Sequence, residues 1–153
     1  EHPSIEFLPL AQGSLICIVS ADDPLASKDT ISPEEIAGRP LIGIDPKDPY
    51  GNIMTRIFER CGLEYEIAIR ARFGTTVVQL VKQGMGMAVI DRFTVADDLG
   101  PGSGIAVLQI SANPAFETYV AVRKDLELSG FAEHFLTMLR AEMNDYGPFT
   151  QHA

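Results

Sequence analysis

The chain has 153 residues, of which 46% are hydrophobic and 22% charged, and its formal net charge is −9. This composition is typical of a globular protein, and the acidic charge argues against direct binding to a nucleic-acid backbone, which needs clustered lysine and arginine. No apolar run approaches the roughly 18 residues that span a membrane, so we expect no membrane contact.

The first half of the chain predicts alternating strands and helices, which indicates an α/β fold. Continuous apolar runs at residues 14–19 and 40–44 are typical of buried strands. Between them, residues 32–35 ("SPEE") carry the signature of a capped helix start, with proline at the first helical position. A helix with apolar residues at helical spacing follows at residues 52–62 and ends at Gly62.

The alternation continues up to residue 110. Residues 64–71 alternate between apolar and polar positions, as in a strand with one face toward solvent. A short helix is expected at residues 76–83, a buried strand at 87–90, a short helical piece after it, and a further strand at 105–110.

The C-terminal part is expected to add a strand at residues 116–122 and the clearest amphipathic helix of the chain at residues 129–143. Ser129 is the expected cap of that helix. The helix carries one apolar stripe, made of Phe131, Phe135, Met138, Leu139 and Met143. The residues from 145 onward are expected to be loosely held.

The Gly-x-Gly at Gly84 and Gly86 could suggest a nucleotide loop, but the order of elements is reversed. In a dinucleotide-binding turn the glycines follow a strand and open a helix, so that phosphate meets the positive helix N-terminus. Here they follow a helix, whose negative end repels phosphate. We therefore interpret Gly84 as a helix stop and Gly86 as part of a tight turn.

Thr75 and Thr76 stand at the expected start of the helix at residues 76–83, which leaves two interpretations open. Either threonine can cap the helix through its hydroxyl. Alternatively, a hydroxyl and the free N–H groups of the first turn can bind a ligand anion. The two roles are compatible, because one threonine can cap while its neighbour faces outward.

Three loops are candidates for one shared binding site, because ligands of open α/β sheets bind at the carboxyl ends of strands, beside helix N-termini. The first loop runs from Asp45 to residues 50–52, the second is residues 74–76, and the third begins at Asp91. An ordinary turn role for Asp45 and Asp48 fits the sequence equally well.

Residue types that carry catalysis or bind metals are sparse. Two of the three histidines stand at the ends of the chain, and His134 is expected on the solvent side of the last helix. No cluster of His, Cys, Asp and Glu has metal-ligand spacing, and Cys17 and Cys61 are expected to be free thiols in a reducing compartment. We therefore expect no enzyme activity, no metal and no other cofactor.

Several stretches, taken in order, resemble the effector-binding domain of LysR-type transcriptional regulators. Residues 13–44 resemble the family's strand, its "HPLA" tetrad and the "L-x-x-L-x-G-x-P-x-I" segment that follows. Residues 75–91 ("TTVVQLVKQGMGMAVID") are similar to the family's "L-V-x-x-G-x-G-I-A" unit, and residues 119–139 to its closing "V-R-x…S-x-A-x-x-F" strand and helix. The resemblance covers about residues 7–143.

The resemblance implies a two-lobed α/β fold of the type II periplasmic-binding-protein kind, with one lobe complete and the other partial. Residues 14–108 would form the second lobe, and residues 1–13 and 109–153 part of the first, with a small-molecule effector between them. It also implies a C-terminal fragment of a bacterial regulator, which contacts DNA only through an absent N-terminal winged helix-turn-helix. We expect a cytoplasmic homodimer or homotetramer.

Two positions depart from the family pattern: Asp23 replaces the histidine of "HPLA", and Asp91 stands where proline is usual. Residues 89–91 ("VID") resemble the subgroup that responds to opines and related amino-acid derivatives. The resemblance therefore implies an effector that is an amino-acid derivative or a small carboxylate. The expected effector-binding residues are Asp45, Tyr50, Gly51, Thr75, Thr76 and Asp91.

In this arrangement, backbone N–H groups at residues 51–52 and 75–76 would bind the effector's carboxylate. Asp45 or Asp91 would bind a positive group.

Two other functions share this fold. A solute-binding protein of a transport system would need an export signal, which the opening residues "EHPSIEFLPL" do not show. An enzyme on the same scaffold would need a catalytic base or nucleophile in the cleft, and the sequence offers none that stands out.

Overall fold

The computed structural model describes residues 3–43, 49–100, 102–112 and 114–145. The chain divides into two compact units. Unit 1 comprises Glu1–Ser14 and Ala115–Ala153, and unit 2 comprises Leu15–Pro114. Strand β1 (Ile5–Ser20) contributes its first part to unit 1 and its second part to unit 2.

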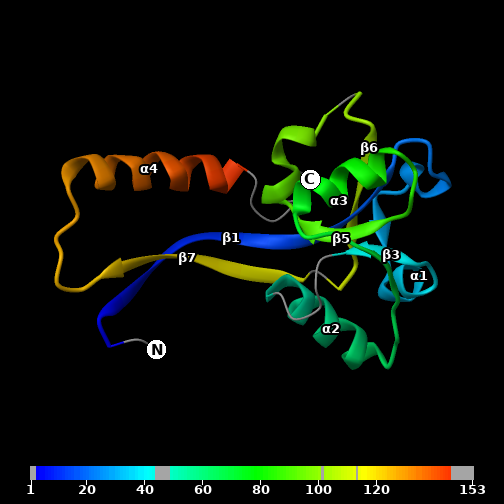
Figure 1. Cartoon of the computed structure of the whole chain (residues 1–153), viewed down its shortest axis with the longest axis horizontal. Helices are drawn as coiled ribbons and strands as arrows, with labels where there is room; N and C mark the ends of the chain where they lie inside the picture. Colours follow the sequence, from blue (N-terminus) through cyan, green and yellow to red (C-terminus); the bar gives the residue numbers. More distant parts are fainter. Residues whose placement is uncertain (1–2, 44–48, 101, 113, 146–153) are drawn as a thin grey trace. The chain divides into compact units, whose positions relative to one another are not determined.

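Unit 2 is built on a sheet with the strand order β2-β6-β1-β5 (Figure 1). The strands are β2 (Thr30–Ile31), β6 (Ile105–Ile110), the second part of β1, and β5 (Ala88–Asp91). β1 is antiparallel to both of its neighbours, and β2 is parallel to β6. The apolar run predicted as a strand at residues 14–19 thus lies at the centre of the sheet.

Two further strands extend the architecture beside β5. β3 (Leu41–Gly43) and β4 (Ile67–Arg70) pair in parallel. Leu41 also forms a parallel bridge with Met87, just before β5, and the N–H of Ile42 donates to the carbonyl of Met87 at 2.8 Å. β4, β3 and β5 therefore run in the same direction, and their carboxyl ends share one edge.

Helices α2 (Pro49–Cys61) and α3 (Gly74–Lys82) connect these parallel strands. In Figure 1, α3 lies above the strands and α2 below them. The apolar face of α3 packs into a buried cluster with strands β1, β3, β5 and β6, made of Ile16, Ile18, Ile42, Val77, Val78, Val81, Ala88, Ile90, Val95 and Ile105. α2 buries Met54, Ile57 and Phe58.

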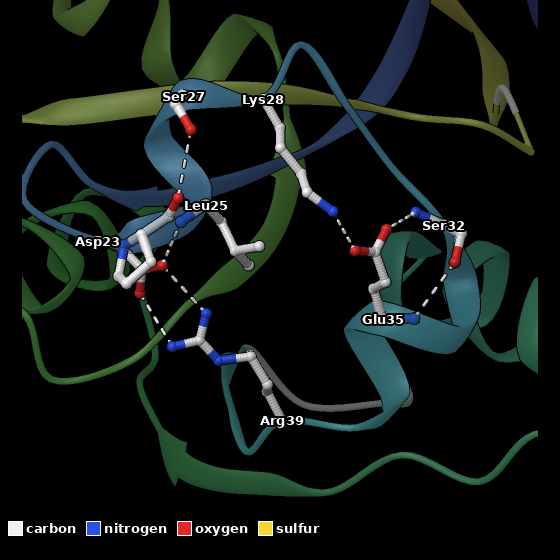
Figure 2. A network of polar contacts seen from close by, with 8 residues as sticks. Asp23, Leu25, Ser27, Lys28, Ser32, Glu35 and Arg39 are labelled. Carbon is white, nitrogen blue, oxygen red and sulfur yellow. Dashed lines mark hydrogen bonds and ion pairs between the residues drawn. The ribbon is translucent and has the colours of Figure 1, made fainter.

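Figure 2 shows the polar contacts that hold the segment after β1. Asp23 caps the short helix η1 (Pro24–Ser27), because its Oδ1 accepts a hydrogen bond from the N–H of Leu25 at 2.9 Å. The same carboxylate accepts hydrogen bonds from both terminal guanidinium nitrogens of Arg39, at 3.1 and 2.9 Å. Asp23, which departs from the family's histidine, thus ties η1 to the segment that leads into β3.

The capping box predicted at "SPEE" is confirmed at the start of α1 (Pro33–Ala37). The N–H of Glu35 donates to the Ser32 hydroxyl at 3.3 Å, and the N–H of Ser32 donates to the Glu35 carboxylate at 3.1 Å. Figure 2 shows these reciprocal bonds. The predicted helix stops are also confirmed: Gly62 and Gly84 have φ angles of 67° and 71°, which favour glycine.

Unit 1 contains the first part of β1, strand β7 (Ala115–Arg123) and helix α4 (Gly130–Asp145). The two strands are antiparallel, from Ile5 opposite Arg123 to Ser14 opposite Ala115. Ser129 caps α4, since its hydroxyl accepts from the N–H of Ala132 at 3.3 Å.

The apolar stripe predicted on α4 does not form a buried face. Phe131, Phe135 and Met138 are 92%, 61% and 59% exposed, and the buried side chain of α4 is Leu136. Among the described residues, unit 1 offers only two strand segments and this helix, so no further layer covers the stripe.

Both cysteines are free. Cys17 lies at the centre of the sheet and is fully buried, whereas Cys61 is exposed at the end of α2. Burial raises the pKa of the Cys17 thiol to about 12.

The short helix η2 (Phe93–Asp98) follows β5, as predicted. No helix within the described ranges is long and apolar enough to cross a membrane.

Candidate functional site

The predicted site residues that the structure describes lie on three chain segments at the carboxyl edge of β4, β3 and β5. Tyr50 and Gly51 are in the first turn of α2, which follows β3. Thr75 and Thr76 are in the first turn of α3, which follows β4, and Asp91 is the last residue of β5. Asp45 lies outside the described residues.

At the start of α3, neither Thr75 nor Thr76 is the N-cap residue. The N-cap residue is Phe73, whose extended backbone carries no side-chain cap. Thr75 and Thr76 are therefore already helical, and both are exposed. The prediction that one of them caps the helix is wrong, because the helix begins at Gly74, earlier than expected.

This earlier start changes which N–H groups are available. The N–H of Thr76 donates to the carbonyl of Phe73 at 3.0 Å. In the described part of the chain, the N–H groups of Gly74 and Thr75 have no backbone acceptor. An anion at this helix end would therefore meet Gly74 and Thr75 rather than Thr75 and Thr76.

A cation stands next to this helix end. The guanidinium carbon of Arg72 lies 5.5 Å from the centroid of the Phe73 ring, a geometry typical of a cation–π contact. Together with the positive end of the α3 dipole, Arg72 makes this corner favourable for a negative group. The sequence analysis did not single out Arg72, although it directly precedes the phenylalanine at the helix start.

Asp91 is only 3% exposed, and its carboxylate is bonded within the chain rather than free. Oδ1 accepts from the N–H of Thr94 at 2.9 Å, and Oδ2 accepts from the Thr94 hydroxyl at 2.5 Å. These bonds stabilise the first turn of η2. Since a carboxylate offers about four lone pairs and Thr94 uses two, Asp91 retains capacity for about two more donors.

Thr94 also links Asp91 to the start of α3. A Cβ added to Gly74 would lie 2.6 Å from Cγ2 of Thr94 and 3.3 Å from Cδ1 of Ile90. The helix start therefore packs directly against the residue that holds Asp91. The sequence analysis missed Thr94, although its spacing of three residues from Asp91 is typical of a local side-chain to backbone bond.

A small pocket of about 30 Å³ lies in unit 2 at the same three strands and α2. Gly51, one of the two predicted site residues of α2, lines it. Other lining residues are Gly43, Met54, Ile67, Val89 and Ile90. Ile90 directly precedes Asp91, so the pocket adjoins the end of β5.

Arg92 follows Asp91 and is partly buried, which lowers the pKa of its guanidinium from its usual value. Within the described ranges, no group of three or more His, Cys, Asp or Glu side chains is placed to hold a metal ion. The edge can therefore offer N–H donors, hydroxyls and a cation to an anion, and one buried carboxylate to a positive group.

Residues 1–144 match the family model described as the LysR substrate binding domain. Among curated relatives, the HTH-type transcriptional regulator CbbR of Xanthobacter flavus is 27% identical over 136 residues, which cover 87% of this chain and 40% of CbbR. The transcriptional activator protein LysR of Escherichia coli strain K12 is 23% identical over 96 residues, 63% of this chain and 30% of LysR. The chain thus spans about 30–40% of the length of these relatives.

Solved structures resemble nearly the whole chain. The CcmR regulatory domain of Synechocystis PCC6803 in complex with 2-PG has a TM-score of 0.74 at 23% identity, over 93% of this chain and 70% of that one. The effector binding domain of QuiR in complex with shikimate has a TM-score of 0.70 at 21% identity, over 95% and 68% of the two chains. This likeness confirms the predicted fold class, a mixed α/β fold of the periplasmic-binding-protein-like, two-lobed kind.

Proposed function

The chain belongs to the LysR substrate-binding domain family, and from this we propose that it is the effector-sensing domain of a LysR-type transcriptional regulator. Residues 14–108 would be the second lobe of that domain, and residues 1–13 and 109–153 part of the first. The regulator contacts DNA through a separate N-terminal domain, and acts in the cytoplasm as a homodimer or homotetramer. It is not an enzyme.

The observation that carries this proposal is the donor set at the carboxyl edge of unit 2. The α3 helix start offers the N–H groups of Gly74 and Thr75, two exposed threonine hydroxyls, and the nearby Arg72. Such a corner binds a carboxylate or a similar anion. The two solved relatives named above hold small molecules, 2-PG and shikimate, which supports a small acid as the effector.

Asp91 extends this proposal to the class of effector. A positive group beside an anionic group, as in an amino-acid derivative such as an opine, would pair with the spare acceptor capacity of Asp91. Since Asp91 is buried, this pairing would be little screened by solvent. Asp45 and Tyr50 belong to the same proposed site, as groups on the loop and helix after β3.

The effector acts by shifting a population of conformers. A ligand that binds one conformation of the domain more tightly than another favours that conformation by its difference in affinity. The favoured state alters how the oligomer presents its DNA-binding domains.

A solute-binding protein of a transport system is the second candidate, because it shares the fold. The family model and the curated relatives favour the regulator. The gene sequence upstream of this segment separates the two, since a regulator encodes a helix-turn-helix there and a transport protein encodes an export signal.

A thermal-shift screen of the full-length protein tests the proposal. The panel contains amino acids, opines and small carboxylates, together with shikimate and 2-PG. A true effector at about 100 times its Kd adds about 2.7 kcal/mol to the free energy of unfolding. The effector must also change the affinity for promoter DNA. Absence of stabilisation by every compound, or binding that leaves DNA affinity unchanged, contradicts the proposal.

Two variants then test the site. Thr75→Val and Thr76→Val each remove a hydroxyl while keeping the shape of the side chain. Whichever hydroxyl binds the anion, its loss raises the effector Kd about tenfold or more, because hydrogen bonds to charged groups contribute about 1.5–3 kcal/mol. Thr137→Val, at an exposed position of α4 in unit 1, is the matched control. Unchanged affinity in both variants removes the threonines from the site.

A further inference from the structure

The pocket beside the proposed effector site is lined by apolar side chains in the part of the chain that the structure describes. Its described lining residues, from β3, α2, β4 and β5, are aliphatic side chains, Met54 and two glycines. No hydroxyl, amide or charged side chain is among them.

The size of the pocket decides what it can hold. A water-sized group needs roughly 10–15 Å³ of such volume, and the pocket has about 30 Å³. It therefore has room for about two or three such groups. A whole amino acid or sugar acid does not fit, whereas a short aliphatic chain does.

The position of the pocket connects it to the charged part of the site. Gly51 lines it from the first turn of α2, and Ile90 lines it from the position before Asp91. The pocket therefore lies at the same carboxyl edge of the strands as the start of α3 and Asp91.

We propose that this pocket holds a short aliphatic chain of the effector, two or three carbons long, and so selects effectors by chain length. The inference rests on the proposed function, because it assigns the apolar part of the same ligand. The effector is then a small acid or amino acid with an ethyl-sized or propyl-sized side chain, rather than a wholly polar molecule.

Gly43 and Ile67 set the size of the pocket. A Cβ added at Gly43 would lie 2.7 Å from Cδ1 of Ile67 and 3.6 Å from its Cγ2. Gly43→Ala therefore adds a methyl group to the lining and displaces the end of the Ile67 side chain. Ile67→Val removes one methylene and enlarges the pocket.

A calorimetric titration of the full-length protein with two homologous series tests the proposal. One series is lactate, 2-hydroxybutyrate, 2-hydroxyvalerate and 2-hydroxyhexanoate. The other is alanine, 2-aminobutyrate, norvaline and norleucine. Affinity is expected to rise about fourfold with each methylene up to the ethyl or propyl side chain, the gain typical of apolar burial, and to fall at the butyl side chain.

The variants should change the side-chain length that binds most tightly. In Gly43→Ala the affinity for the propyl compound is expected to fall more than tenfold, while the affinity for the methyl compound stays unchanged. In Ile67→Val the butyl compound binds about fourfold more tightly, because one further methylene is accommodated. Ile69→Val is the matched control: it lies on the same strand, carries the same deletion, and packs against the buried cluster rather than the pocket. Thermal unfolding verifies that each variant is folded.

Two results overturn the inference. One is that the affinity does not depend on the length of the side chain, or that Gly43→Ala changes the affinity no more than Ile69→Val does. The other is absence of binding by every member of both series. If shikimate, 2-PG or an opine still binds and Thr75→Val or Thr76→Val weakens it, the proposed function stands without the chain-length pocket. If no acid of the wider panel binds, the proposed function falls as well.

Discussion

The carboxylate of Asp91 accepts two hydrogen bonds from Thr94 within a nearly fully buried setting. A purely structural carboxylate would serve only to start η2, and a ligand-binding carboxylate would use its remaining lone pairs. The two roles make different demands, because the local bonds need acceptor oxygens whereas an effector cation needs the negative charge.

Asp91→Asn separates these two roles. The amide oxygen can still accept from the N–H of Thr94, and the Thr94 hydroxyl can accept from the amide, so the turn is kept while the charge is lost. We expect affinity for an effector with a positive group to fall about 10–100-fold. Affinity for a purely anionic ligand should stay the same or rise. Titration of both ligand types measures the difference.

Thr94→Val is the complementary variant. It keeps the charge of Asp91 and removes one of its donors. If Asp91→Asn weakens both ligand types equally, or has no more effect than Thr94→Val, the charge of Asp91 has no role in binding.

The guanidinium of Arg39 lowers the pKa of the Asp23 carboxyl below its usual value of 3.8, since it donates two hydrogen bonds to the charged form. The capping bond from Leu25 acts in the same direction. Because the folded pKa is depressed, the contribution of this pair to stability is fully present above about pH 3.8 and is lost as the pH falls through the lower folded value.

Asp23→Asn should therefore cost about 1 kcal/mol at pH 6, a magnitude limited by the partial exposure of Arg39. The difference from the parent protein should begin to shrink below pH 3.8 and should vanish as the pH falls through the lower folded pKa, where the folded parent carboxyl also becomes neutral. Urea unfolding at pH 6, 4 and 3 measures this. Asp29→Asn, at an exposed position before β2, is the control. A difference that persists unchanged at pH 3 contradicts the ion-pair explanation.

At the scale of elements, the start of α3 depends on a missing side chain. Gly74→Ala would place a methyl group 2.6 Å from Cγ2 of Thr94. We expect a loss of about 1–3 kcal/mol in the free energy of unfolding, because overpacking outweighs the better helix propensity of alanine. The displaced Thr94 should also weaken effector binding through Asp91.

Gly130→Ala is a matched control for this substitution. Gly130 likewise is the first residue of a helix, α4, and a Cβ there meets nothing within 4 Å. We expect it to be neutral or to stabilise by about 0.4–1 kcal/mol. Similar urea midpoints for the two variants would show that Gly74 is not required by packing.

The elements that sequence predicts well are those set by local chemistry. The capping box at Ser32 and Glu35 and the stops at Gly62 and Gly84 each depend on residues a few positions apart, and all are present. β6 lies at residues 105–110, as the apolar run predicts, because its pattern is complete within the strand.

Elements set by distant contacts were predicted less well. The start of α3 is fixed by the contact of Gly74 with Thr94, which no local pattern reveals. β1 begins at Ile5, well before the predicted residue 14. Pro9 argues against a strand there, and the structure accommodates it at an irregularity between Pro9 and Ala11, opposite β7.

In the candidate site too, some features follow from local sequence patterns and others only from contacts between distant residues. That Gly51, Thr75, Thr76 and Asp91 lie at one edge follows from the alternating order of strands and helices. That Asp91 is already bonded, and that the usable N–H groups include Gly74, follows from packing. The effector-binding roles of these residues stay predictions, which the variants above address.

For the whole molecule, the net charge and the length of the chain fit a proposed regulator in which this segment binds the effector and another segment binds DNA. The net charge of −9 disfavours contact with a phosphate backbone. The chain spans only about 30–40% of the length of its curated relatives. Sensing by this segment and DNA binding by another segment therefore fit the proposed function better than both tasks on one surface.

The buried thiol of Cys17 can serve as a chemical reporter of how often the sheet of unit 2 opens, because the other thiol, Cys61, is exposed and can be removed by substitution. Only the thiolate reacts with alkylating reagents, and the buried Cys17, with a pKa of about 12, should react only when the sheet of unit 2 opens. In a Cys61→Ser variant, the alkylation rate of Cys17, followed by mass spectrometry at pH 8, would then measure how often the strands separate. A bound effector should slow this rate by the factor 1 + [L]/Kd. Equal rates with and without effector would show that the opening that exposes Cys17 leaves the effector site intact.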